Sequence, residues 1–133
     1  MTTRLYLPLT PADVTTLHER GELPPARPAY GVSPALIAAT GREDEEEREY
    51  LAFQDAVAAA GDLAGAQGRM LVLALDLPER DVAFAPDSTE SRLGRPIARR
   101  EAVSIHVGEE AGPDADLLWY DITELEVVAG LLV

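Results

Sequence analysis

The stretch 70-MLVLALDL-77 decides the fold of this chain. Asp76 is the only polar residue among its eight, so neither side of an extended strand would face water. A strand that is apolar on both sides is typical of the centre of a sheet covered by other elements on both faces. We therefore expect residues 70–77 to form a central strand, with the remaining strands and helices packed around it.

Further segments have the residue pattern of strands. Residues 3–9 (TRLYLPL) and 102–107 (AVSIHV) alternate between apolar and polar side chains, which indicates strands with one buried face. Residues 117–121 (LLWYD) are predicted as a last strand and residues 82–86 (VAFAP) as a short neighbour of the central one. The polar segment 87–96 (DSTESRLGRP) is expected to be a loop.

Two helices are predicted from N-cap residues that precede a proline. Thr10-Pro11 and Ser33-Pro34 each combine a capping hydroxyl with a proline in the first helical position. Both segments continue with apolar residues and end near the next glycine along the chain. We expect a helix after each of these pairs.

A third helix is predicted over residues 43–60, which contain no proline and no glycine and are rich in strong helix formers. It begins in the stretch REDEEEREYLAF, residues 42–53, where five acidic residues follow one another. Apolar residues occur only from its second turn onward. They predict a buried face made of Tyr50, Leu51, Phe53, Val57 and Ala58.

The C-terminal segment leaves two alternatives open. Asp121 and Glu124 have the spacing of a capping box, which favours a helix over residues 122–129. The alternating residues of TELEVV would also suit a strand with Leu125 and Val127 on its inner side. We favour the helix.

These elements predict a single α+β domain over residues 1–133. We expect a mixed sheet of about four to six strands, with three or four helices mostly on one face. The chain is 133 residues long and 47% hydrophobic, which is enough for a core without crosslinks. It contains no cysteine, which excludes disulfides, thiol catalysis and cysteine-bound metal.

The charge of the chain is strongly negative. The net charge is −13, and residues 101–133 contain eight acidic residues and no Lys or Arg. A field of this sign repels phosphate groups, so we expect neither nucleic-acid binding nor binding to an anionic membrane. The start of the chain does not resemble a secretory signal, and no apolar run is long enough to cross a bilayer. We expect a cytoplasmic protein.

The acidic run has three interpretations: a metal site, a docking surface for a basic partner, or the solvated start of a helix. Glu43 and Glu47 would share a helix face and could meet one cation, but no motif of a di-iron or calcium site accompanies them. Acidic residues at a helix N-terminus are stabilised by the helix dipole without any partner. The solvated helix start is therefore favoured, and we expect no metal.

One histidine lies in a predicted strand beside a serine. His106 and Ser104 should share the side of residues 102–107 that is opposite to the apolar one. A catalytic serine–histidine pair needs the two side chains to touch and a third group to orient the ring. Neighbours two apart on a strand point outward in parallel, so we favour a structural histidine.

Several segments, taken in order, resemble a family of small actinobacterial proteins of unknown function: RLYLPLT, AYGVSPAL, EDEEEREYLAFQDA, RMLVLALDLP, AVSIHV and LLWYDITEL. The resemblance spans nearly the whole chain and implies a shared ancestry, with no assigned activity or cofactor. In the family pattern an acidic residue follows the VHV-type strand. Gly108 stands there in this chain, which puts any role for an acid at that position in doubt.

A looser likeness is to ADP-ribosyltransferase-type folds, which carry an Arg on the first strand, a Ser on a later one and a Glu near the end. Arg4, Ser33 and Glu126 stand in that order. The likeness implies an enzyme that binds a nicotinamide nucleotide. It requires the three side chains to converge on one cleft, and Ser33 already has a role as an N-cap.

We favour a non-catalytic interaction module without a cofactor and with a basic protein as its partner. Trp119 and Tyr120 are adjacent on a strand and must point to opposite faces, so one of them could be exposed beside acidic residues. An exposed aromatic residue of this kind is typical of a protein contact. The residues predicted to bind the partner are Glu43, Glu46, Glu47, Trp119 and Tyr120.

Overall fold

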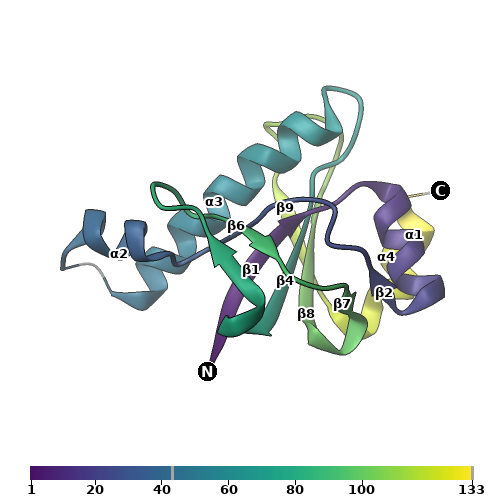
Figure 1. Ribbon diagram of the computed structural model, residues 1–133. Coiled ribbons are helices and arrows are strands. Elements are labelled where there is room, and N and C mark those ends of the chain that lie inside the picture. Colours follow the sequence, from purple (N-terminus) through teal and green to yellow (C-terminus); the bar gives the residue numbers. More distant parts are fainter. Residues whose placement is uncertain (43, 133) are drawn as a thin grey trace.

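A computed structural model describes residues 1–42 and 44–132 of the chain. Its main feature is a seven-stranded sheet in the order β5-β6-β3-β1-β4-β8-β9, and β2 and β7 form a separate two-stranded ribbon (Figure 1). The pairings within these sheets are antiparallel. The strands are β1 (Thr2–Pro8), β2 (Glu22–Leu23), β3 (Ala29–Gly31), β4 (Leu71–Pro78), β5 (Val82–Phe84), β6 (Glu90–Leu93), β7 (Ile97–Ala98), β8 (Ala102–Gly108) and β9 (Leu117–Asp121).

Strand β4 is the centre of the sheet, as its apolar sequence predicts. It pairs with β1 along its whole length on one side and with β8 on the other. Its side chains alternate between two separate clusters of buried residues, one on each face of the sheet. The double-sided apolar pattern of residues 70–77 therefore reflects burial on both faces.

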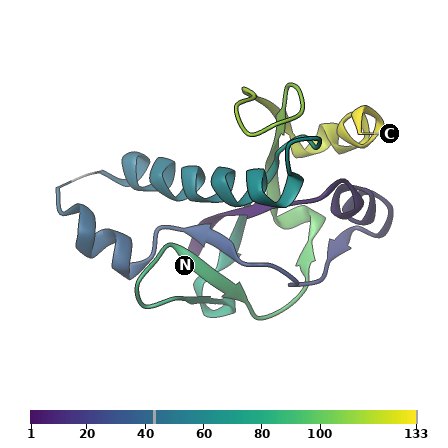
Figure 2. The same cartoon turned by 90° about the horizontal axis from the view of Figure 1, so that it is seen from above.

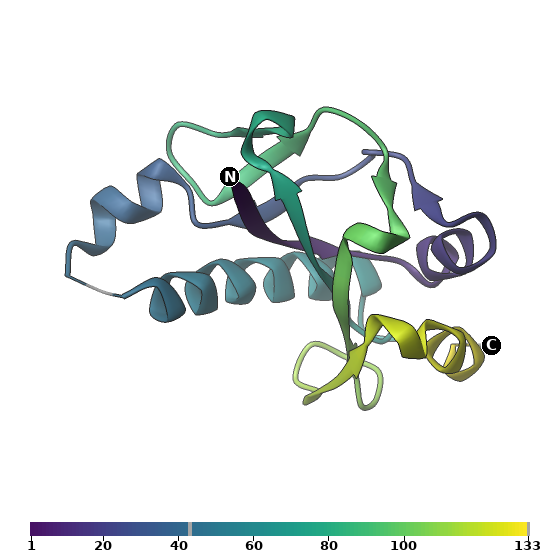
Figure 3. The same cartoon turned by 90° about the horizontal axis from the view of Figure 1, so that it is seen from below.

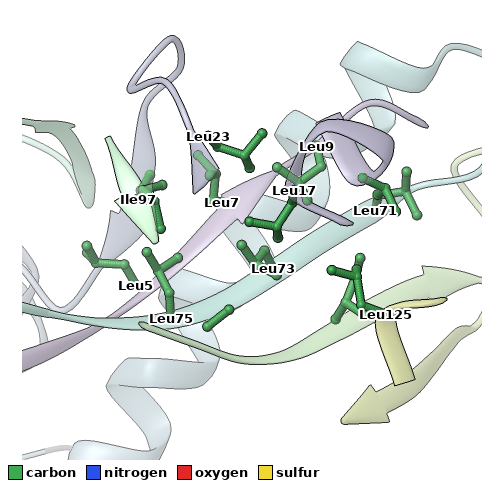
Figure 4. Close-up of a cluster of buried hydrophobic side chains, with 14 of the residues drawn as sticks. Leu5, Leu7, Leu9, Leu17, Leu23, Leu71, Leu73, Leu75, Ile97 and Leu125 are labelled. Carbon is green, nitrogen blue, oxygen red and sulfur yellow. The ribbon is translucent and has the colours of Figure 1, made fainter. Parts of the chain in front are cut away.

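One face of the sheet, which we call the leucine face, carries the larger cluster. Its central side chains come from β4, from β1 and from the residue that follows β1: Leu5, Leu7, Leu9, Leu71, Leu73, Leu75 and Leu77 (Figure 4). Helices α1 (Pro11–Arg20) and α4 (Leu125–Leu131) cover this face with Val14, Leu17, Leu125 and Val128. Leu23 and Ile97 of the ribbon β2–β7 close the cluster.

The opposite face, which we call the cleft face, is covered by α3 (Glu45–Ala64). The residues of this helix that meet the sheet are Ala52, Ala56 and Ala60, which recur every four positions and are fully buried. Their small side chains let the helix lie close to the strands, mainly over β1, β3 and β4 (Figure 2). The predicted buried face is wrong for Tyr50 and Ala58, which are exposed. Phe53 and Val57 are partly buried and pack against the edge of the cluster.

The short helix α2 (Pro34–Thr40) projects beyond the sheet next to the start of α3 (Figures 1 and 2). Ser33 caps it, as predicted: the backbone N–H of Leu36 donates to Ser33 Oγ at 3.1 Å. Arg48 ties the two helices together by donating to Thr40 Oγ1 and to the carbonyl oxygen of Gly41. No residue of α2 is buried, so its position depends on these polar contacts.

The C-terminal segment is helical, which settles the alternative left open by its sequence. Asp121 and Glu124 form a capping box around a 3-10 turn, Ile122–Glu124, that leads into α4. Leu125 and Val128 point into the cluster of the leucine face, as the helical pattern predicts. A strand would have placed Val127 inside, whereas it is exposed.

The α+β class is confirmed, with three differences from the expectation. The sheet has seven strands, it is antiparallel where a mixed sheet was expected, and the helices are divided between its two faces. Strands β3 and β6 were not expected, and β6 lies in the polar segment predicted as a loop. Ser91 is buried there because its hydroxyl donates to the carbonyl oxygen of Ala29 at 2.9 Å.

Candidate binding cleft

A cleft of about 300 Å³ opens on the cleft face between α3 and the strands β8 and β9. It exists because α3 lies mainly over β1, β3 and β4, so the last two strands of the sheet are only partly covered on this side. This space, which we call the cleft, is lined by Arg4, Tyr6, Tyr50, Phe53, Ala74, Ser104, His106 and Trp119.

The strand side of the cleft follows from the register of β8 and β9. His106 lies directly opposite Trp119, and residues opposite each other in an antiparallel pair project from the same face. Trp119 is 60% exposed, whereas His106 is half-buried and Ser104 is almost fully buried. The two strands therefore offer an aromatic wall at the sheet edge and a polar floor further in.

The helix side of the cleft is aromatic as well. Tyr50 and Phe53 lie on the flank of α3 that faces β8 and β9. The Phe53 ring contacts Tyr6 edge-on, with 5.3 Å between the ring centres, and contacts His106 at 4.8 Å with a tilt of 58°. These contacts hold Phe53 in place, while Tyr50 at the rim stays 60% exposed.

An ion pair occupies the end of the cleft nearest the start of β1. Arg4 and Asp76 are direct partners across β1 and β4. The Arg4 Nε donates to Asp76 Oδ1 at 2.7 Å and its Nη2 donates to Oδ2 at 3.2 Å. This two-pronged pairing uses the guanidinium fork and raises the pKa of Arg4. The positive charge of Arg4 is thus matched within the protein.

Glu49 lies one turn before the buried alanines of α3, close to this pair. Burial raises the pKa of its carboxyl group, and the neighbouring acids Glu45, Glu46 and Asp76 add to that rise, against the opposing effect of Arg4. Within residues 1–42 and 44–132, no ion pair is formed by Glu49. Glu49 precedes the lining residue Phe53 by four positions on α3, so it stands beside the cleft as a partly desolvated carboxylate.

Burial also keeps the other titratable side chains of the cleft neutral. It lowers the pKa of His106, so the imidazole is uncharged at neutral pH, and it raises the pKa of Tyr6, whose phenol keeps its proton. Ser104 and His106 share one face, as predicted, yet no hydrogen bond joins their side chains within the described part of the chain. The pair lacks the contact that a serine nucleophile and its base require.

The structure separates the residues that were predicted to bind a partner. Trp119 lines the cleft, whereas Tyr120 points to the leucine face and packs against its cluster. Glu46 is exposed on α3 one turn before Tyr50, and Glu47 is exposed on the outer side of the same helix. Glu43 lies outside the described residues.

The residues of the enzyme alternative are not brought together. Arg4 is on the cleft face and paired with Asp76, and Ser33 is buried as the cap of α2. Glu126 is exposed on α4, which packs on the leucine face, far from the start of β1 (Figure 3). The cleft that this alternative requires is therefore not formed by these three side chains.

The metal alternative rests on Glu43 and Glu47, of which the first is outside the described residues. Among residues 1–42 and 44–132, no group of three or more His, Cys, Asp or Glu side chains is placed to hold a metal ion. In the same part of the chain, no helix is both long and apolar enough to cross a membrane.

Comparison with known proteins places the chain in a family. Residues 3–115 match DUF6912, described as a family of unknown function. The chain belongs to DUF6912. The match agrees with the expected relationship to proteins of unknown function, while the actinobacterial origin of the family stays a prediction. Searches of the curated proteins and of the solved structures gave no match.

The DUF6912 match includes every lining residue of the cleft except Trp119, which lies after its end. It also includes Gly108, where an acidic residue was expected from the resemblance. Gly108 is buried, and a Cβ at this position would lie 3.1 Å from the backbone nitrogen of Met70 and 3.1 Å from the carbonyl oxygen of Glu110. The local backbone therefore leaves little room for a side chain there.

Sequence reasoning found Trp119, His106 and Ser104 but not the cleft that unites them. Tyr50 and Phe53 were assigned to a buried helix face, and Tyr6 to a strand without any site. The signal that could have found the cleft is the alanine repeat of residues 52, 56 and 60. It marks the side of α3 that meets the sheet and leaves the aromatic residues at its border.

Proposed function

We propose that this DUF6912 chain is a non-catalytic, cytoplasmic binding module that docks a basic protein over the cleft. The observation that carries the proposal is the exposure of Tyr50 and Trp119, each 60% exposed, on two sides of one cleft. Large aromatic side chains are enriched at the centres of protein interfaces, where a partner removes them from water. Two of them at a single cleft support this surface as the docking site.

The charge around the cleft supports a basic partner. Glu45, Glu46 and Glu47 are exposed at the start of α3, and Asp116 and Asp121 flank the ends of β9. The whole chain carries a net charge of −13. Such a field attracts positively charged proteins and accelerates their association.

The chemistry of the cleft supports binding rather than catalysis. The arginine of the cleft is paired with Asp76, and among the described residues no hydrogen bond joins its histidine to its serine. The groups that remain available are aromatic faces, hydroxyl groups and a neutral imidazole. These groups suit the recognition of a side chain by contact and hydrogen bonding.

The test is a calorimetric titration with a peptide of eight lysines at increasing salt concentration. We expect the dissociation constant to rise steeply between about 50 and about 500 mM salt, because the Debye length falls from roughly 14 Å to roughly 4 Å over that range. An absence of binding at low salt, or an affinity that does not change with salt, would contradict the proposal.

Two variants locate the binding surface. Trp119→Ala should lower the affinity of the protein for the peptide by at least about fivefold, which is the loss expected for a central aromatic contact. Val127→Ala is the matched control, since Val127 is 55% exposed but lies on α4, on the other face of the sheet. Equal losses in both variants would show that the peptide does not bind at the cleft.

A further inference from the structure

The cleft has features that select one kind of side chain from a basic partner. Its volume of about 300 Å³ is at the lower limit of ligand pockets, which suits a single side chain better than a cofactor. Tyr50 and Trp119 line it and are largely exposed, whereas the lining residues Tyr6, Ser104 and His106 are more deeply buried. A ligand that fits must combine a flat apolar surface with hydrogen-bond donors.

The charges around the cleft determine whether that ligand should be positively or negatively charged. Arg4 is neutralised by its two hydrogen bonds to Asp76, so it is not free to receive an anion. Glu49 adds a second carboxylate to the same region and, among the described residues, is not part of an ion pair. Glu46 stands one turn before Tyr50 at the rim. The net charge at the mouth of the cleft is negative, and it favours a cation.

The geometry points to an arginine side chain of the partner: we propose that its guanidinium inserts between Tyr50 and Trp119 with Glu49 as its counter-ion. This inference rests on the proposed function, of which it names the recognition element. A guanidinium is planar and stacks on aromatic rings, and it is less strongly hydrated than the ammonium of lysine. Its several N–H donors can also reach the hydroxyl oxygens and the neutral imidazole of the cleft.

Two peptides of equal charge test this inference. One is the peptide of eight lysines, and the other has one central lysine replaced by arginine. We expect the arginine peptide to bind about threefold to tenfold more tightly, because a guanidinium stacks on aromatic rings and pairs with a carboxylate through two hydrogen bonds. The emission of Trp119, the only tryptophan in the chain, should change in proportion to the occupancy of the cleft by the arginine peptide.

The variant Glu49→Gln tests where on the protein the arginine of the peptide binds. The variant should lose most of the preference for arginine, because a carboxylate pairs with a guanidinium through two parallel hydrogen bonds, which an ammonium group cannot form. Glu47→Gln is the matched control: it removes the same charge from the outer side of the same helix and should keep the preference for arginine. A preference that survives in Glu49→Gln would overturn the inference.

The outcomes separate this inference from the proposed function. Equal, salt-dependent binding of the two peptides by the unaltered protein would overturn the arginine preference and leave the docking of basic partners supported. Failure of both peptides to bind would overturn both. Tighter binding of the arginine peptide that is lost in Glu49→Gln would support both.

Discussion

The two faces of the sheet are built from the same strands but have different properties. On the leucine face, two helices and a short ribbon cover an apolar cluster with large side chains. On the cleft face, one helix with buried alanines covers only part of the strands, and aromatic and polar residues line the remainder. The pKa values of Arg4, Tyr6, Glu49 and His106 are all shifted on this second face.

This difference indicates that one face of the sheet mainly provides stability and the other mainly presents polar groups. Large apolar side chains provide most of the area removed from water, so the leucine face supplies most of the stability. A helix that meets the sheet through alanines contributes less area but can lie close to the strands. The strands that it leaves uncovered are free to carry polar groups. Four predictions, ordered from the largest expected effect to the smallest, examine this division.

Leu73→Ala should cause the largest loss of stability. Leu73 is fully buried in the cluster of the leucine face, and the substitution leaves a cavity. We expect the free energy of unfolding to fall by about 2–5 kcal/mol. Urea denaturation followed by circular dichroism measures it. Leu118→Ala is the control. Leu118 on β9 is 42% exposed, so this substitution should lower the free energy of unfolding much less.

Ala56→Leu should also destabilise the protein, for the opposite reason. Ala56 is fully buried between α3 and the sheet, so a larger side chain must push the helix away. We expect a loss of about 1–3 kcal/mol, together with a change in the fluorescence of Trp119 as the cleft widens. Ala58→Leu, on the exposed side of the helix, should be nearly neutral. An increase in stability for Ala56→Leu would contradict close packing of α3.

His106→Phe should remove part of the pH dependence of stability. Burial lowers the pKa of His106 below 6.5, so below that pH the unfolded chain takes up a proton before the folded one does. The free energy of unfolding should therefore decrease as the pH falls from about 7.5 to about 5.5, with a slope below the one-proton limit of about 1.4 kcal/mol per pH unit.

The phenylalanine variant should lose this slope. The measurement stops near pH 5.5 because Glu49 acts in the opposite direction at lower pH. Its raised pKa lets the folded protein take up a proton first and gain stability. An unchanged slope in His106→Phe would assign the effect to another group.

Trp119→Ala should have the smallest effect on folding. The side chain is 60% exposed, so we expect the free energy of unfolding to change by no more than about 0.5 kcal/mol. Tyr120→Ala is the matched comparison. The Tyr120 ring packs against the leucine face, so its removal should lower the free energy of unfolding clearly more. A large loss for Trp119→Ala would mean that the cleft is part of the structural core.

Most regular elements of this fold could be predicted from local sequence. The caps at Thr10 and Ser33 and the capping box at Asp121 lie where their residue types indicate, because a cap depends only on residues three or four positions apart. Strand β6 could not be predicted, since its pairing and the burial of Ser91 depend on a partner far away in the chain.

The sequence by itself determined the central strand, the caps of the helices, the negative charge and the shared face of Ser104 and His106. These properties follow from the periodicity and chemistry of neighbouring residues. Only the tertiary structure decided that α3 meets the sheet through alanines and stops short of β8 and β9. That placement brings Tyr6, Tyr50, His106 and Trp119, from four different elements, to one cleft. Contacts between distant elements depend on packing, which no local pattern contains.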